Sequence, residues 1–314
     1  MKIFSNISVI TIVIIGLVGC KTDSSKITRL VQVAHPISRD SCTGLGYGFK
    51  TACRLTADYN ATLSECGKNG NAPAFVCSGI LIRGTDSNLN RNYYSWNPSP
   101  KSVKSGGVSF SYLRKDSPFQ RFAYGYVSGF IFHPQEYTPH PLDSNIEVLC
   151  SFPKDGGTDG RTDHGCGINL QNDARSLPCN KIGITTGQGW VNKYQNVVGI
   201  NTCGFNVNEK SGLNTKQGFN ATIEAMGLLR KLGMGGNANE LRLATWRQNK
   251  TDIPIEAFFY LKGYNNGLLS AQKDQKEFYQ QTGNKVPIIS IVLPADYNAY
   301  QAQFLYQAWD QLIK

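Results

Sequence analysis

Short runs of apolar and alternating residues, closed by glycine or proline, recur along most of this chain. One run, Ile80 to Ile82, is continuous and ends at Arg83 followed by glycine. A second, over residues 108–112, alternates, so that Ser109 and Ser111 share one face and Phe110 takes the other. Short length, β-branched content and glycine punctuation are typical of strands. The pattern predicts two strands, one ending in an arginine and one carrying two serines.

Similar patterns predict the other elements. Further strands are expected once or twice within residues 119–132, and then over 146–152, 240–246, 253–261 and 286–293. Helical spacing is found over 55–66, 187–194, 219–232 and 267–281. A last helix is expected over 296–313, with Asp296 as N-cap and Phe304 on its apolar stripe. The expected fold class is α+β, with mixed, mostly antiparallel sheets and packed helices.

The N-terminal segment has the pattern of a bacterial signal peptide. Lys2 precedes an apolar run over residues 7–18, which is too short for a spanning helix. The ending Leu-Val-Gly-Cys20 resembles a lipobox. We therefore expect removal of residues 1–19, lipidation of Cys20, a tether over 20–40 and a secreted domain over 41–314, which could form two packed lobes. An ordinary secretory signal with an incidental cysteine is the alternative.

The expected location follows from the same segment. Lys21, rather than aspartate, follows the lipidated cysteine. Similarity to sorted lipoproteins then favours the outer membrane, on its periplasmic or surface face, or release from it. The membrane is thus an expected partner through the lipid anchor.

Nine cysteines, less Cys20, leave an even number for an exported chain, which implies disulfides. They are Cys42, Cys53, Cys66, Cys77, Cys150, Cys166, Cys179 and Cys203. Local closure suggests Cys150–Cys166 or Cys179–Cys203, with further pairs among the first four. Zinc is disfavoured because no C-x-x-C occurs and the four histidines are scattered. The aspartates at 155, 159 and 163 lack the downstream glutamate of a calcium loop, so no metal is expected.

The charge bears on the expected partners. A formal net charge of +10 favours contact with anionic surfaces, lipopolysaccharide or nucleotide phosphates. No dense run of lysine and arginine with interleaved aromatic residues occurs, so nucleic acid is not an expected partner.

Several residues are candidates for chemistry. Arg83 offers a planar fork to a phosphate or carboxylate, and Ser109 and Ser111 could complete such a site. A solvent-exposed arginine beside edge serines is the structural alternative. In the aromatic loop over 86–104, Tyr93 and Trp96 either pack over a cleft or contact a ligand.

Glu256 is the favoured catalytic residue. It is the one charge in the apolar segment 253–261, where a carboxylate is costly unless it is paired or used. Alternation places it on one face with Phe258, opposite Ala257. A structural partner such as Arg83 or Arg242 would also account for it. Glu240, on the preceding strand, is the alternative carboxylate.

Several blocks of the chain resemble the halovibrins, secreted bacterial proteins described as ADP-ribosyltransferases or NAD glycohydrolases. The blocks are Trp96-Asn-Pro, Gly107-Val-Ser-Phe-Ser, Cys150-Ser-Phe-Pro, Asn239-Glu-Leu and Ile255-Glu-Ala-Phe-Phe-Tyr, and the likeness covers roughly residues 53–293. This resemblance implies an enzyme with NAD as substrate and no bound cofactor.

The motifs also resemble those of the arginine–serine–glutamate ADP-ribosyltransferases, in the same order. Arg83 matches the arginine that holds NAD phosphate in that family. Ser109 and Ser111 match the Ser-x-Ser that braces the site, and Glu256 matches the glutamate that contacts the nicotinamide ribose. The resemblance implies these roles here, with Tyr93 or Trp96 stacking on a ring.

The chain departs from the Glu-x-Glu pair of many such transferases. Position 254 is proline, and position 238, two residues before Glu240, is alanine. The missing glutamate favours hydrolysis of NAD over transfer to an arginine, although a host protein could be the acceptor if transfer occurs. Two other functions stay open: a non-catalytic surface lipoprotein acting as an adhesin or binding module, and a hydrolase of envelope polymer.

Overall fold

The computed structural model describes residues 39–61, 75, 79–86, 92–117, 119–132, 147–158, 161, 165–167, 177–207, 215–234, 236, 238–244, 255–295 and 301–307. All of them belong to the compact unit His35–Lys314. The expected signal peptide, the expected lipidation site Cys20 and nearly all of the expected tether lie outside the described residues. None of the helices within the described ranges is long and apolar enough to cross a membrane.

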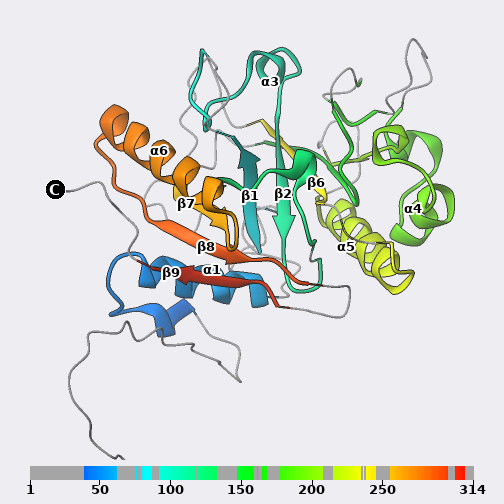
Figure 1. Ribbon diagram of the computed structural model, residues 1–314. Coiled ribbons are helices and arrows are strands. Elements are labelled where there is room, and N and C mark those ends of the chain that lie inside the picture. Colours follow the sequence, from blue (N-terminus) through cyan, green and yellow to red (C-terminus); the bar gives the residue numbers. More distant parts are fainter. Residues whose placement is uncertain are drawn as a thin grey trace, which may run out of the picture. The chain divides into compact units, whose positions relative to one another are not determined.

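The described part of the chain has the expected α+β fold, built on a nine-stranded mixed sheet (Figure 1). The strand order is β5-β4-β6-β2-β1-β3-β7-β8-β9. Neighbouring strands are antiparallel, except β7 and β8, which are parallel. The strands are β1 (Ile80–Thr85), β2 (Val108–Leu113), β3 (Ser128–Phe132), β4 (Glu147–Phe152), β5 (Phe205–Asn206), β6 (Glu240–Ala244), β7 (Ile255–Leu261), β8 (Ile288–Val292) and β9 (Gln303–Tyr306).

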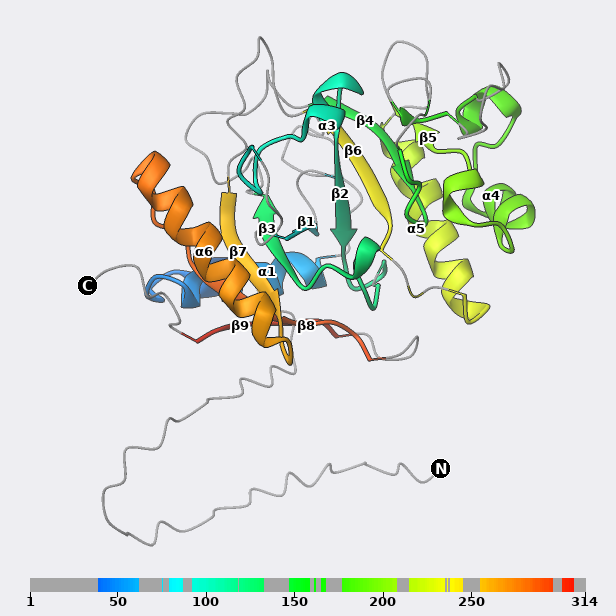
Figure 2. The ribbon, with the colours of Figure 1, turned by 45° about the horizontal axis from the view of Figure 1, so that its top comes forward.

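Helices cover different parts of this sheet (Figure 2). α6 packs against β7 and β3, α5 against β4 and β5, and α1 against β9. α4 contacts α5, whereas the short α3 lies next to β2. The α-helices are α1 (Phe49–Asn60), α3 (Pro100–Lys104), α4 (Gly187–Tyr194), α5 (Thr215–Lys231) and α6 (Asn265–Thr282), and the 3-10 helices are η1 (Arg39–Cys42), η2 (Ala123–Gly125), η6 (Cys179–Ile182) and η7 (Gly199–Asn201).

Alternation along the strands divides the apolar side chains between two buried clusters. Phe110 and Phe258 belong to the cluster that includes residues of α6. Ile82 and Phe259 belong to the cluster that includes residues of α1. Because successive side chains of a strand point to opposite faces, this division anchors both faces of the sheet. The strands that carry the candidate residues are thus held from both sides.

The pairing of β2 changes along its length, and this opens the sheet. The second half of β2 pairs with β1, through Ile80↔Leu113 to Ile82↔Ser111. Its first half pairs with β6, through Ser109↔Arg242 and Phe110↔Leu241. Among the described strands, the last residues of β1, from Arg83 to Thr85, pair only with β3. A gap therefore separates the end of β1 from the start of β2.

The structure corrects some predicted elements. Residues 296–313 were expected to form a helix, but residues 303–306 form β9, which pairs with β8 from Ile289↔Tyr306 to Val292↔Gln303. The free edge of β8 offers backbone hydrogen bonds, and this tertiary environment overrides a helical spacing of apolar residues. Within 119–132, only β3 is a long strand, and the preceding residues form turns and η2. The first helix lies earlier than expected, at Phe49–Asn60.

Three disulfides occur among the described cysteines. Cys150–Cys166 and Cys179–Cys203 are the two local closures suggested by the sequence. Cys42–Cys53, which joins η1 to α1, is a pair among the first four cysteines, as expected. Cys66 and Cys77 lie outside the described residues.

Candidate functional site

A polar cavity of about 300 Å³ lies where β1 and β2 separate. This volume is at the lower end of the range of small-molecule sites. Ionisable and hydroxyl side chains from four parts of the chain line it. They include Arg83 of β1, Ser109 and Ser111 of β2, Asp155 of the loop after β4, and Glu240 and Arg242 of β6.

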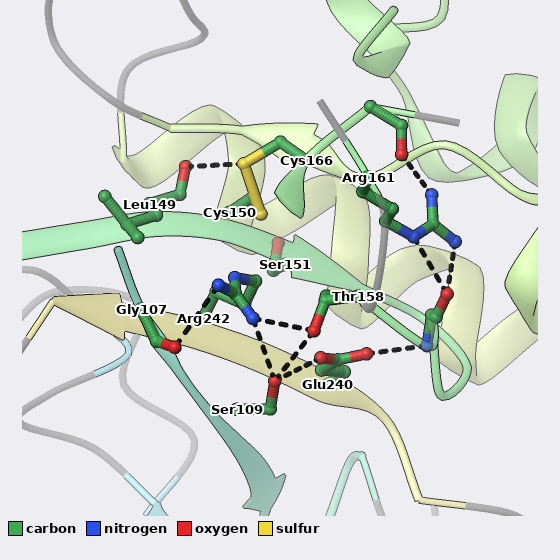
Figure 3. Close-up of a disulfide and its surroundings, with 12 residues drawn as sticks. Gly107, Ser109, Leu149, Cys150, Ser151, Thr158, Arg161, Cys166, Glu240 and Arg242 are labelled. Atoms are coloured by element: carbon green, nitrogen blue, oxygen red, sulfur yellow. Dashed lines mark hydrogen bonds between the residues drawn. A yellow bond between two sulfur atoms is a disulfide. The ribbon is translucent and has the colours of Figure 1, made fainter. Parts of the chain in front are cut away.

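Glu240 is the buried carboxylate of this cavity, with only 5% of its surface exposed. The Ser109 hydroxyl donates a hydrogen bond of 2.5 Å to Glu240 Oε1 (Figure 3). The backbone N–H of Gly156 donates to Glu240 Oε2 at 2.8 Å. These donors compensate for the loss of water around a buried carboxylate and fix its orientation.

Arg242, two residues further along β6, braces the same wall. Its side chain is almost fully buried. One guanidinium nitrogen donates to the Thr158 hydroxyl at 2.6 Å and to the Ser109 hydroxyl at 3.3 Å (Figure 3). The other donates to Ser105 Oγ at 2.8 Å and to the Gly107 carbonyl at 3.2 Å. Its donors are thus directed at protein acceptors, so we assign Arg242 a positioning role.

Arg83 lies across the gap from Ser109. Its Nη1 donates to the Ser109 carbonyl at 2.5 Å, which links β1 to β2 beyond the end of their pairing. Gly129 of β3 allows the backbone of β1 to approach closely at Arg83, because a Cβ there would lie 2.0 Å from the Arg83 carbonyl oxygen. The half-buried guanidinium lines the cavity, where its planar fork suits a phosphate.

The loop after β4 contributes Asp155, which lines the same cavity as Glu240 and directly precedes Gly156, whose N–H donates to Glu240. Burial raises the pKa of Asp155 to about 6, and the neighbouring Glu240 charge adds to this effect. The backbone N–H of Gly157 donates to Asp155 Oδ1 at 3.2 Å. Two carboxyl groups therefore line one cavity, and the pKa of one of them is raised to about 6.

Arg161 and a disulfide hold this loop in place (Figure 3). The buried Arg161 guanidinium donates to the carbonyl groups of Gly156, Thr202 and Ile200 and lies over the Phe152 ring. The Cys150–Cys166 disulfide ties the far end of the loop to β4. The residues that directly follow Asp155 are thus held by hydrogen bonds, which preorganises Asp155 beside Glu240 in the cavity.

The aromatic candidates divide between the cavity and the core. Tyr93 lines the cavity and is partly buried. Trp96 instead lies in the core, stacked on Tyr94 and in edge contact with Phe258, which leaves Tyr93 as the aromatic candidate in the described lining of this cavity. The cavity rim also includes Tyr124, which is 83% exposed and has a positive φ of 58°. Backbone strain of this kind is concentrated at functional sites.

Glu256 does not lie where the sequence interpretation requires. It is absent from the described cavity lining, and its carboxylate forms an ion pair of 3.1 Å with Arg54 of α1. The reason is a β-bulge: Ile131 pairs with Ala257 and Phe132 with Ile255, which leaves Glu256 as the extra residue. The regular alternation predicted for this strand breaks at that residue. Glu240, the alternative carboxylate, is the one that lines the cavity with Arg83 and Ser109.

The sequence interpretation missed Asp155, Thr158 and Tyr124 as members of this site. Asp155 was considered only as a calcium ligand, and nothing in its loop indicates which strand the loop will meet. The described residues contain no group of three or more histidines, cysteines or acidic residues that could hold a metal ion. A second cavity, of about 250 Å³, lies near Lys154, Met226 and Arg230 and contains none of the candidate residues.

Neither a scan against protein-family models nor a search of curated proteins finds a match to this chain.

Proposed function

We propose that this chain is an NAD-consuming enzyme, a glycohydrolase or an ADP-ribosyltransferase, that cleaves the bond between nicotinamide and ribose. One observation carries the proposal: Arg83, Ser109 and Glu240 come from three adjacent strands and line one cavity. Their order along the chain is that of the arginine–serine–glutamate enzymes, with Glu240 in the role expected of Glu256. NAD is the substrate, and no bound cofactor is needed.

The chemistry requires a carboxylate at this position. Cleavage of the N-glycosidic bond develops positive charge on the ribose as neutral nicotinamide departs. A carboxylate that is fixed by two donors and shielded from water can stabilise that charge without reorganisation. The bonds from Ser109 and from the Gly156 N–H hold Glu240 in this way.

The other residues bind the rest of the substrate. The Arg83 guanidinium pairs with the pyrophosphate, which suits its planar donors. Ser109 orients Glu240, and Ser111 lies on the same cavity wall. Tyr93 and the exposed Tyr124 are placed to stack on a ring of the dinucleotide. Alanine at position 238 leaves no Glu-x-Glu pair, which favours hydrolysis over transfer to an arginine.

The test compares two buried glutamates. The oxidised full-length protein, purified in detergent, is incubated with NAD, and nicotinamide release is measured for the wild type, Glu240→Gln and Glu256→Gln. We expect release by the wild type and a fall of about a hundredfold or more in kcat for Glu240→Gln. Glu256→Gln, which alters a glutamate of similar burial outside the cavity lining, is expected to keep kcat within about threefold of the wild type.

The outcomes distinguish the functional classes. A loss of release in Glu256→Gln but not in Glu240→Gln would contradict the proposed role of Glu240. Absence of release from the folded wild type, with and without a protein acceptor, would contradict NAD cleavage altogether.

The second candidate, a non-catalytic surface lipoprotein acting as an adhesin or binding module, would then be favoured. Two observations support it. Glu256 is paired away from the cavity, and the exposed Tyr124 stands beside Tyr126 on the cavity rim. Exposed aromatic residues of this kind are common in binding surfaces.

A further inference from the structure

The cavity contains a second carboxyl group for which the proposed roles of Arg83, Ser109 and Glu240 provide no use. Asp155 lies on a loop that is distant from β6 in the sequence, yet it lines the same cavity as Glu240, and the N–H of the next residue, Gly156, donates to Glu240. A pair of like charges in a partly buried cavity is unfavourable unless it has a use or a shared proton.

The contacts of the loop show that this placement is built rather than incidental. The Gly156 N–H donates to Glu240, and the Thr158 hydroxyl contacts both Ser109 and Arg242. On the other side, Arg161 donates to the carbonyl groups of Gly156 and Gly157. Asp155 therefore directly precedes an anchored segment, and the Gly157 N–H of that segment donates to its carboxyl group.

The chemistry of the leaving group limits what Asp155 can do. The nicotinamide ring nitrogen is cationic while it is bonded to the ribose and becomes neutral when that bond breaks, so the leaving group needs no proton from a general acid. The incoming water, by contrast, must lose a proton as its oxygen bonds to the ribose carbon. Enzymes that hydrolyse glycosidic bonds commonly divide these tasks between two carboxyl groups.

We propose that Asp155 is the general base that activates the attacking water. This inference rests on the proposed function. In the step, the bond between the ribose C1′ and the nicotinamide nitrogen breaks, and its electron pair stays on nicotinamide. The water oxygen bonds to C1′, and one water proton passes to the Asp155 carboxylate, which later releases it to solvent. Glu240 stabilises the ribosyl cation and takes no proton.

The electrostatic surroundings suit a base that works near neutrality. Desolvation and the Glu240 charge raise the pKa of Asp155 to about 6, whereas the Gly157 N–H and the Arg161 charge oppose the rise. Arg242 reaches the same loop through Thr158. Below about pH 6 the carboxyl group is protonated and cannot accept a proton, so kcat should increase as pH rises through this value.

The experiment uses the full-length protein and azide, an anion that can attack the ribose carbon without help from a general base. Nicotinamide release is measured for the wild type, Asp155→Asn and Glu240→Gln, with and without sodium azide, over a range of pH. Asparagine keeps an oxygen that can accept the Gly157 N–H bond, so the loop contact is retained. A urea unfolding curve for each variant checks that the fold is kept.

We expect kcat of Asp155→Asn to fall by about a hundredfold and to lose its dependence on pH near 6. Azide should restore it by about tenfold or more, with ribosyl azide as product, because azide attacks without losing a proton. Glu240→Gln should not be restored. A folded Asp155→Asn variant within about threefold of the wild type, or one that azide does not restore, would overturn the role of Asp155 and leave the proposed function standing. A wild type that releases no nicotinamide would overturn both.

Discussion

Two glutamates of this protein are almost equally buried but have different surroundings. Glu240 is 5% exposed and accepts hydrogen bonds from the Ser109 hydroxyl and the Gly156 N–H beside a cavity. Glu256 is 6% exposed and pairs with the Arg54 guanidinium of α1. Burial alone makes either carboxylate costly, so it cannot distinguish a structural residue from a catalytic one. The neighbours distinguish them, because an ion pair within the core cannot reach a substrate.

A third acidic residue, Asp274 of α6, has no place in the proposed chemistry and should affect stability. Its side chain is fully buried, and burial raises its pKa to about 7, although the nearby Ser95 hydroxyl lowers it. The unfolded chain ionises at the ordinary value, so the folded state binds more protons between about pH 4 and 7. The free energy of unfolding should therefore decrease as pH rises through this range, by roughly 4 kcal/mol at most.

Urea unfolding of the wild type and Asp274→Asn, at about pH 5 and about pH 8, measures this effect. The variant should be the more stable protein at the higher pH, and its stability should vary less with pH. Asp155 contributes in the same direction and is retained in the variant, so part of the slope should remain. Equal slopes for the two proteins would contradict the assignment to Asp274.

Among the elements, the described residues that follow β4 (153–158, 161 and 165–167) bring together distant parts of the site. They follow β4 and are joined back to it by the disulfide between Cys166 and Cys150. They bring Asp155 and Thr158 to β2 and β6 (Figure 3). Many of their contacts are hydrogen bonds from Arg161 to backbone carbonyls, which a flexible loop would exchange for water. The disulfide therefore acts on the site through the position of this loop.

Removal of this disulfide should reduce both stability and activity. For the double variant Cys150→Ser, Cys166→Ser we expect a loss of about 3 kcal/mol in the free energy of unfolding. We also expect nicotinamide release to fall by about tenfold or more at a temperature where the protein stays folded, because the loop loses its fixed position. Urea unfolding and the nicotinamide assay measure the two effects.

The matched control is Cys42→Ser, Cys53→Ser, which opens the disulfide between η1 and α1. Neither cysteine lies in the described lining of the cavity. This variant should lose stability but keep its rate of nicotinamide release. Equal losses of activity in both double variants would mean that the Cys150–Cys166 disulfide acts only through global stability.

At the scale of the whole molecule, the change of pairing along β2 makes the cavity. If β1 and β6 paired with β2 along its full length, side chains would fill the space that the cavity occupies. Here β1 leaves β2 after Ile82↔Ser111, and β6 joins at Phe110↔Leu241. The side chains at this divergence are therefore exposed to a cavity while their backbones stay within the sheet. The basic chain, with a net charge of +10, suits an anionic dinucleotide.

The location of the whole molecule can be tested at Cys20. If the Leu-Val-Gly-Cys segment is a lipobox, Cys20→Ala should abolish incorporation of labelled palmitate and move the protein from the membrane fraction to the soluble fraction, because acyl chains supply the attachment. Cys42→Ala is the control, since that cysteine forms a disulfide. Labelling that persists in Cys20→Ala would contradict the lipobox.

Local patterns predicted most elements because they report directly on burial. The helix at Gly187–Tyr194 and the strand beginning at Val108 have the expected bounds or nearly so. The C-terminal segment failed because the spacing that places Phe304 on a helical stripe also permits a strand. Pairing with β8, more than 10 residues away, decided between them.

The periodicity of the sequence determined the α+β fold class and the strands that carry Arg83 and the two serines, and the cysteine spacing suggested two of the disulfides as local closures. Only the tertiary structure decided which glutamate joins Arg83 and the serines. The bulge at Glu256, the pairing of β6 with β2 and the folding back of the Asp155 loop all depend on contacts between residues distant in the chain. Alternation describes where a side chain points along one strand, but not which strand lies beside it.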